Sequence, residues 1–261
     1  MSGPSYHRPA NAAAIAPGRL VYSLSHAPQS PDRTHISGRP GPRDLLSSDS
    51  LPFNYLAVDG PIGVGKTTLV EMLARRFEGV KVLEDVENPF LEKFYQDRPG
   101  AAFQTQLYFL LSRFKQQQEI IQRELFHRLV VADYPFEKDR VFAYLNLTDD
   151  ELLIYDKLYA MLEAQIPAPD LVLYLVADVD TCMARIKKRQ RNFERQLSSD
   201  YLTELLDAYN HYYHYYSRSP VLVVDTRHLN FPQRPSDFEE LVAQLKKPIK
   251  GTQYYVPLGS R

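Results

Sequence analysis

Cysteine is nearly missing from this sequence, since Cys182 is the only one among 261 residues. A single thiol excludes an internal disulfide and fits a reducing compartment. Because neither a second cysteine nor a group of histidines is present, we expect no zinc site. No apolar run reaches the about 18 residues of a membrane span, and no unit of sequence is repeated. These absences predict a soluble, cytoplasmic protein without a membrane partner.

An excess of charge of one sign is also lacking, because 31 basic residues face 32 acidic ones and the formal net charge is −1. Such a balance provides no extended positive field for binding a nucleic acid polymer. A small phosphorylated ligand needs only a local basic cluster, so the composition leaves nucleotides open as ligands.

Residues 1–52 differ in composition from the rest of the chain. They contain eight of the 19 prolines, many Ser and Ala residues, and no strong periodicity. Such a segment cannot bury enough apolar surface to offset its ordering entropy, so we predict a disordered tail. A targeting segment is the alternative, but three Asp residues and the scattered prolines argue against an amphipathic presequence. Residues 53–261 are predicted to form one domain.

Short apolar segments alternate with helical patterns throughout this domain. The predicted strands are Tyr55–Asp59, Val80–Leu83, Leu129–Ala132, Leu171–Val176 and Val221–Val224. The predicted helices are Thr67–Phe77, Ala102–Arg123, Asp150–Ala164, Val179–Arg189, Ser199–Tyr216 and Asp237–Leu245. This alternation predicts an α/β fold with a parallel five-stranded sheet and helices on both faces. Ligands then bind at the carboxyl ends of the strands.

A phosphate-binding motif follows the first strand. The sequence GPIGVGKTT has the form G-x-x-x-x-G-K-[ST], and it lies between a strand and a helix as the motif requires. Backbone N–H groups and the helix N-terminus would bind phosphate oxygens, Lys66 would reach the β- and γ-phosphates, and Thr67 would hold Mg²⁺. An ordinary Gly-rich turn is the alternative. The predicted nucleotide-binding residues are Gly60, Gly63, Gly65, Lys66, Thr67 and Thr68.

Carboxylates follow two of the other strands. Glu84 and Glu87 come after the second strand, where a carboxylate can accept the proton of an attacking hydroxyl. Asp133 follows the third strand, the place of a magnesium-associated carboxylate in P-loop enzymes. The alternatives are a solvated acidic turn for the first pair and a helix cap for Asp133.

A basic segment follows the fourth strand. Six Lys or Arg residues lie between Arg185 and Arg195, and Arg185 and Arg189 share a helix face. Arginines suit the charge that develops on a transferring phosphoryl group, so the segment could close over the phosphates as a lid. A solvated basic face is the alternative.

Five motifs in this order resemble the deoxynucleoside kinase family. They are GPIGVGKTT, ENPFLEKFY, FQTQLYFLLSRFKQ, ADYPFEKDRVFA and RIKKRQRNFE. The resemblance runs from about Tyr55 to Leu245. Within the family, the sequence is most similar to the bacterial deoxyguanosine and deoxyadenosine kinase branch. It implies a P-loop kinase that uses ATP and Mg²⁺ to phosphorylate the 5′-hydroxyl of a deoxynucleoside, with purines preferred, in purine salvage. It also implies a homodimer.

The resemblance further implies roles for individual residues. Glu84 is the expected general base, with Glu87 as the alternative, and it acts with Lys66 and Arg189 in catalysis. The expected acceptor-binding residues are Glu84, Tyr95, Gln106, Arg113, Asp139 and Glu194. The expected lid arginines are Arg185, Arg189 and Arg191, and Mg²⁺ is expected at Thr67 and Asp133. Gln106 and Arg113 lie two helical turns apart, so they share a face, although Arg113 and Asp139 could also form a structural ion pair.

One motif departs from the family pattern. Many members have an arginine directly after the carboxylate of the third strand, whereas this chain has Tyr134 after Asp133. We name Arg140 or a lid arginine as its substitute. The Asp-Tyr-Pro sequence also argues against the chief rival, a thymidylate-kinase-like enzyme. A second rival, a noncatalytic nucleotide-binding module, is disfavoured because Glu84 and the basic segment are present.

Overall fold

The computed structural model describes residues 50–84, 87–96, 98–124, 129–189 and 197–257. They belong to one compact unit, Ser50–Arg261. Most of the predicted tail, residues 1–49, lies outside the described residues. Leu51, near the end of that tail, packs against the hydrophobic core, so the domain begins slightly earlier than residue 53.

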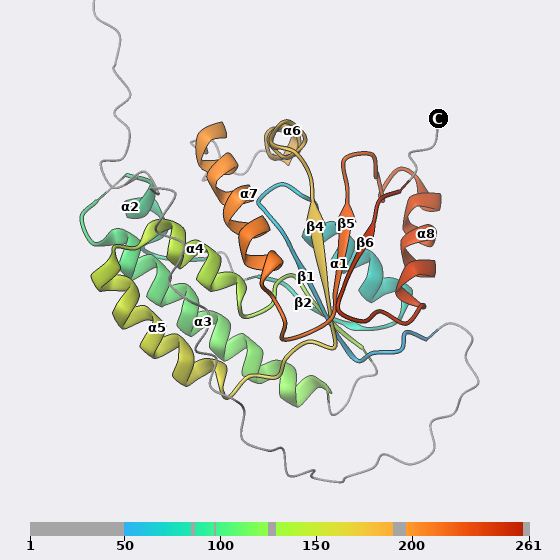
Figure 1. Ribbon diagram of the computed structural model, residues 1–261, viewed down its shortest axis with the longest axis horizontal. Coiled ribbons are helices and arrows are strands. Elements are labelled where there is room, and N and C mark those ends of the chain that lie inside the picture. Colours follow the sequence, from blue (N-terminus) through green and yellow to red (C-terminus); the bar gives the residue numbers. More distant parts are fainter. Residues whose placement is uncertain (1–49, 85–86, 97, 125–128, 190–196, 258–261) are drawn as a thin grey trace, which may run out of the picture. The chain divides into compact units, whose positions relative to one another are not determined.

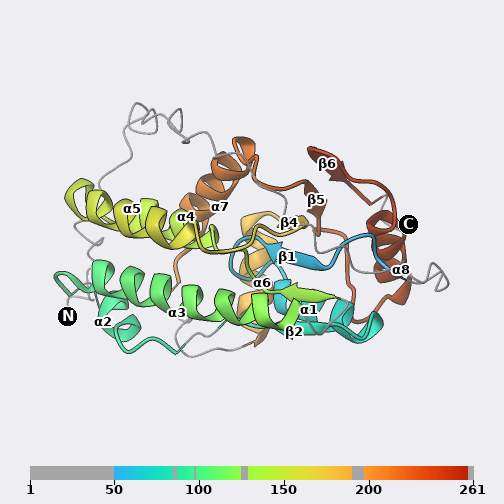
Figure 2. The same ribbon diagram turned by 90° about the horizontal axis from the view of Figure 1, so that it is seen from below.

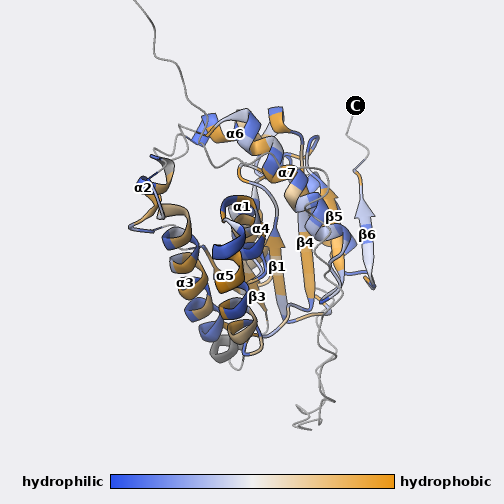
Figure 3. Cartoon of the chain, turned by 60° about the vertical axis from the view of Figure 1, so that its left-hand side comes forward, coloured by the Kyte–Doolittle hydropathy of each residue, from blue (hydrophilic) through white to orange (hydrophobic). Residues whose placement is uncertain are grey.

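A parallel six-stranded sheet forms the centre of the unit, in the order β2-β3-β1-β4-β5-β6. The described strands are β1 Tyr55–Asp59, β2 Val80–Val82, β3 Val130–Ala132, β4 Leu171–Val176, β5 Val221–Asp225 and β6 Thr252–Tyr255. The predicted parallel sheet is confirmed, and it has one strand more than expected. In Figure 3 the central strands are hydrophobic, whereas β6 at the edge is pale to hydrophilic.

Helices cover both faces of this sheet. They are α1 Lys66–Arg76, α2 Leu91–Tyr95, α3 Ala101–Glu124, α4 Lys138–Asn146, α5 Asp149–Glu163, α6 Val179–Arg189, α7 Ser199–His214 and α8 Pro235–Leu245. Figures 1 and 2 show α1 and α8 on one side of the sheet and α3, α4, α5 and α7 on the other. A second, smaller core lies among α3, α4 and α5, around Leu110, Phe136 and Tyr155.

The alternation of side chains along β1 directs its polar groups to one face. Tyr55 and Asp59 lie four residues apart and therefore point the same way. The Tyr55 hydroxyl donates to Gln117 of α3, and Asp59 accepts hydrogen bonds from tyrosines of α7. The intervening Leu56 and Val58 are completely buried, so both faces of this central strand are covered, as in other parallel sheets.

Local signals explain where several helices begin. Thr148 caps α5 in a capping box with Glu151, and the Ser198 side chain accepts from the Tyr201 amide at the start of α7. Pro235 occupies the first turn of α8, where its missing N–H costs nothing. These caps place the helix boundaries close to those predicted from sequence.

Three elements were not predicted: α2, α4 and β6. The short α2 has five residues, and β6 is mostly exposed, so neither shows the buried apolar run that marks a core element. The first turn of α4 contains the charged residues Lys138, Asp139 and Arg140. In the sequence, these charges suggest an exposed loop rather than a helix. In the structure, Lys138 and Asp139 are buried and point into the protein.

Candidate active site

The P-loop connects β1 to α1, and two of its glycines, Gly60 and Gly63, are required by close contacts. Gly60 has φ 142°, and a Cβ atom at this position would lie 2.4 Å from the Leu175 carbonyl oxygen of β4. Gly63 has φ 84°, and its Cβ would lie 2.6 Å from the Cys182 carbonyl oxygen of α6. Any larger residue would force the loop away from both neighbours. The predicted glycines therefore shape a loop that is packed against β4 and α6.

Lys66 and Thr67 begin helix α1 directly after this loop. The Lys66 ammonium donates to the carbonyl oxygens of Gly60 and Pro61, at 2.8 and 3.0 Å. Burial, followed by the charge of Lys138, lowers the pKa of Lys66 to about 8, although neighbouring carboxylates partly offset this. The lysine thus lies folded into its own loop, and phosphate oxygens would offer it stronger partners than two neutral carbonyls.

A hydroxyl near the start of α1 and a carboxylate just beyond β3 could hold Mg²⁺. The Thr67 hydroxyl donates to Asp133 Oδ2 at 2.5 Å. The other oxygen of this carboxylate, Oδ1, is buried and has no hydrogen-bond partner among the described residues. Burial raises the pKa of Asp133 against the opposing charges of Lys66 and Lys138. Oxygen donors of this kind fit Mg²⁺, which binds few protein groups and completes its shell with water and phosphate.

A second carboxylate, Asp59 at the end of β1, is hydrogen-bonded to the first residue of the P-loop. It is fully buried, and it accepts hydrogen bonds from the Gly60 amide at 2.8 Å and from the Tyr213 hydroxyl at 2.6 Å. The Tyr209 hydroxyl lies 3.3 Å from Asp59 Oδ1, the same oxygen that accepts from the Gly60 amide. Burial raises the pKa of Asp59. Sequence analysis assigned no role to this residue, which joins the first amide of the loop to helix α7.

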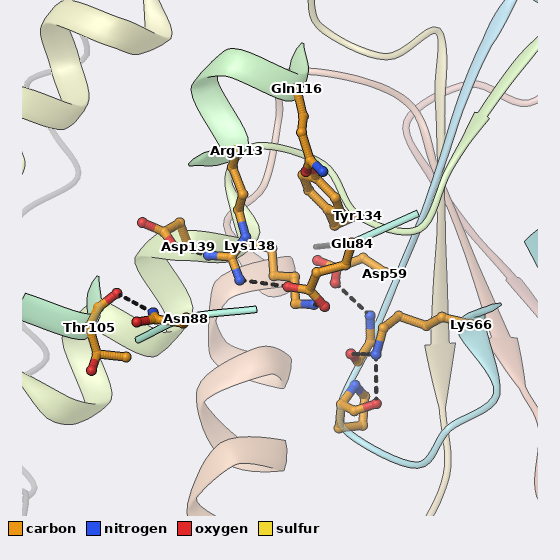
Figure 4. A network of polar contacts seen from close by, with 12 residues as sticks. Asp59, Lys66, Glu84, Asn88, Thr105, Arg113, Gln116, Tyr134, Lys138 and Asp139 are labelled. Atoms are coloured by element: carbon orange, nitrogen blue, oxygen red, sulfur yellow. Dashed lines mark hydrogen bonds and ion pairs between the residues drawn. The ribbon is translucent and has the colours of Figure 1, made fainter. Parts of the chain in front are cut away.

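Glu84, the expected general base, lies just beyond β2 between two cations. Its Oε1 is 2.6 Å from Arg113 of α3, and its Oε2 is 2.6 Å from Lys138 of α4. Figure 4 shows this carboxylate pointing toward both groups, with Lys66 nearby. Burial opposes ionisation, but the two cations outweigh it and lower the pKa of Glu84 well below its usual range. Glu84 is therefore a fixed carboxylate beside the phosphate loop. Glu87 is exposed instead.

Two of the expected acceptor-binding residues, Arg113 and Asp139, form a buried ion pair. Asp139 is completely buried and also accepts a 2.6 Å hydrogen bond from the Tyr155 hydroxyl. Because both of its oxygens are engaged, Asp139 acts on the site through Arg113. Gln106 lies two turns before Arg113 on α3 and is buried, and its Oε1 has no partner in the part of the chain that the structure describes. This oxygen is therefore a buried, unsatisfied acceptor among the described residues.

Arg140, which we named as a substitute for the missing arginine, points away from Glu84. It donates to the Tyr144 hydroxyl at 2.7 Å and lies 3.7 Å from Asp156 of α5. Arg140 therefore pairs with α5 in this structure and is not a cation at Glu84, because Lys138 and Arg140 lie two apart on a helix and project in different directions. Tyr134 is fully buried, and its hydroxyl is bonded to Gln116 of α3. The second cation at Glu84, beside Arg113, is Lys138, which belongs to the ADYPFEKDRVFA motif but was given no role from the sequence.

The basic segment is only partly described. Arg185 of α6 donates to the Val64 carbonyl of the P-loop at 2.9 Å and to the Thr226 carbonyl beyond β5 at 2.7 Å. It therefore braces the loop in this structure. Arg189 lies exposed at the end of α6. Arg191 and Glu194 lie outside the described residues, as does the side chain of Tyr95 at the end of α2.

Among the described residues, no cluster of three or more His, Cys, Asp or Glu side chains that could hold a metal occurs. Within the same ranges, no helix has the length and apolar character needed to cross a membrane.

Comparison with known proteins gives a consistent result. The family model for deoxynucleoside kinases matches residues 56–250. A deoxyguanosine kinase of Bacillus subtilis (strain 168) is 35% identical over 201 residues, covering 75% of this chain and 97% of the relative. A deoxyadenosine/deoxycytidine kinase of the same organism is 32% identical over 217 residues, covering 80% and 99%. The structure of deoxyadenosine kinase from M. mycoides with bound dATP superimposes with a TM-score of 0.64 at 25% identity, covering 74% and 98%.

Proposed function

The chain belongs to the deoxynucleoside kinase family, and we propose that it transfers the γ-phosphate of ATP to the 5′-hydroxyl of a purine deoxynucleoside. Enzymes of this family are transferases that phosphorylate a hydroxyl group. One observation carries the proposal: Glu84, held by Arg113 and Lys138, lies at the same end of the sheet as the P-loop. This arrangement provides a proton acceptor beside a phosphate-binding loop, which is what phosphoryl transfer to a hydroxyl requires.

The proposed reaction needs one proton transfer and one displacement. The 5′-oxygen forms a bond to the γ-phosphorus while the bond from that phosphorus to the bridging oxygen breaks, and ADP leaves with the electron pair. Glu84 accepts the proton of the hydroxyl. A carboxylate of low pKa suffices, because the transition state is loose and proton transfer need not precede bond formation. Lys66 stabilises the charge on the phosphates.

Mg²⁺ would be held by Thr67 and Asp133, as their paired oxygens suggest. When bound, this ion would neutralise charge on the β- and γ-phosphates. The residues contribute the site itself: the Thr67 hydroxyl is fixed by the first turn of α1, and Asp133 by the end of β3.

The purine preference has two supports. The named relatives act on deoxyguanosine or deoxyadenosine, although one of them is also named for deoxycytidine. In addition, the amide of Gln106 can both donate and accept, so it can form two hydrogen bonds to a base edge. A pocket that leaves such a buried group unpaired discriminates strongly against the wrong base.

One assay tests the proposal: purified full-length protein is supplied with ATP and Mg²⁺ and each of the four deoxynucleosides in turn, and ADP release is measured. We expect turnover with deoxyguanosine or deoxyadenosine to exceed turnover with thymidine. Activity on thymidine monophosphate alone would favour the thymidylate-kinase-like rival. Tight ATP binding without turnover of any acceptor would favour a noncatalytic module.

We also propose that the chain forms a homodimer through α3 and α5. Large apolar side chains are exposed on these two contacting helices, namely Leu111, Leu153, Ile154, Leu158 and Met161. Met161 is 67% and Leu153 61% exposed, and a contiguous patch of such side chains would mark an interaction surface. Light scattering should give the mass of two chains. Leu153→Glu with Met161→Glu should give the mass of one, and a monomeric wild-type protein would refute the proposal.

A further inference from the structure

Lys138 occupies a position that is unfavourable for a lysine on three counts. It is the first residue of helix α4, and it is only 4% exposed. A cation at a helix N-terminus opposes the helix dipole, and a buried ammonium loses its hydration. It also lies near a second cation, since its charge lowers the pKa of Lys66. Local helix propensity therefore does not explain a lysine at this position. The explanation must lie in the groups that Lys138 contacts.

The contact that accounts for Lys138 is Glu84. The ammonium lies 2.6 Å from Glu84 Oε2, and Arg113 takes the other oxygen at the same distance. With one cation on each oxygen, the carboxylate cannot rotate about its terminal bond without breaking an ion pair. The Tyr134 and Phe142 rings lie 6.0 and 5.8 Å from the ammonium, so aromatic surface confines it further.

We propose that Lys138 is the positioning residue of Glu84, the group that fixes the carboxylate toward the acceptor hydroxyl and counterbalances charge at the transferring phosphoryl. The inference rests on the proposed function. Charged or titratable groups surround Glu84 from every neighbouring element: Arg113 of α3, Lys138 and Asp139 of α4, Lys66 of α1, Asp133 beyond β3 and Tyr209 of α7. The charge of Lys138 also reaches Asp59, Lys66 and Asp133.

In the proposed role, the charge of Lys138 acts both before and after proton transfer. Before transfer, its charge pairs with the Glu84 carboxylate. As the proton of the hydroxyl moves to Glu84, that carboxyl becomes neutral. The Lys138 charge then faces the negative charge on the phosphoryl group that is being transferred. A purely structural ion pair between β2 and α4 would also explain the 2.6 Å contact, so the test must separate the two roles.

The principal experiment compares Lys138→Met with the wild-type enzyme in kcat, in KM for both substrates and in the pH dependence of kcat, from about pH 8 down to the lowest pH at which both enzymes stay folded. We expect kcat at neutral pH to fall about 10²-fold, with little change in KM for ATP. Removing one of two cations should raise the pKa of Glu84 by about 1–3 units. The acidic limb of the profile should therefore move to higher pH, and Lys138→Arg should restore both properties in part.

Arg140→Met is the matched control, because it removes a cation from the same helix that pairs with α5 rather than with Glu84. We expect it to lower Tm and leave the acidic limb in place. A double-mutant cycle adds a second measurement: in a Glu84→Gln background, Lys138→Met should cost much less than about 10²-fold, because a residue acting through Glu84 has nothing left to position.

Two outcomes overturn the inference. One is a Lys138→Met enzyme whose kcat and acidic limb match the wild type, and the other is an equal loss in the presence and absence of Glu84. If Lys138→Met does not fold, the same comparisons apply to Lys138→Gln and Lys138→Arg. A wild-type protein that phosphorylates no deoxynucleoside would instead refute the proposed function.

Discussion

Asp139 offers a direct test of how the acceptor side of the site is built. The resemblance to the family suggested a residue that reads the base, whereas the structure shows a fully buried carboxylate paired with Arg113 and Tyr155. Breaking a buried ion pair by removing one partner costs about 3–5 kcal/mol. Because Arg113 keeps Glu84 as a second partner, we expect Asp139→Asn to lie near the lower value, about 3 kcal/mol.

A loss of this size should be visible in thermal unfolding followed by circular dichroism. In a domain of this length each kcal/mol shifts Tm by about 2–4 °C, so we expect Asp139→Asn to lower Tm by about 6–12 °C. Tyr155→Phe is the matched variant: it keeps the charges, removes one hydrogen bond and should cost about 1–3 kcal/mol. If Asp139→Asn keeps its Tm and raises KM only for the nucleoside, the carboxylate contacts the base and the reasoning is wrong.

Three further predictions concern the rest of the chain. Glu84→Gln should lower kcat by about 10²–10⁴ in a steady-state assay, and Glu87→Gln should not; the reverse result would identify Glu87 as the base. Gln106→Ala should raise KM for the best nucleoside more than KM for ATP, and equal effects on both would point to a structural role. Removing residues 1–49 should leave kcat unchanged and Tm within about 2 °C, so a large fall in Tm would show that this segment is part of the folded unit.

The features that could be predicted from sequence are those with a local signal. The GPIGVGKTT motif places Gly60 to Gly65 between β1 and α1, and Lys66 to Thr68 in the first turn of α1, without any knowledge of distant contacts. The buried apolar strands β1 and β4 were predicted with the bounds that the structure shows. The carboxylates at the ends of β2 and β3 follow from the rule that parallel strands end at one edge.

The features that were missed depend on distant contacts. Lys138 and Arg140 are both basic and lie in the same turn, yet one contacts Glu84 and the other Asp156. Only the position of α4 relative to β2 and α5 decides this, and charged residues in its first turn hid the helix itself. Asp59 looks like the last residue of an apolar strand, and its partners Tyr209 and Tyr213 come about 150 residues later in the chain.

The brace between Arg185 and the P-loop limits how α6 can move. Arg185 is tied to Val64 on one side and to Thr226 on the other, and the backbone of α6 at Cys182 lies against Gly63. The first two turns of this helix and the loop therefore form one mechanical unit. Any rearrangement that brings Arg189 toward a nucleotide has to bend or unwind the last turn, since a rigid swing of the whole helix would pull the P-loop with it.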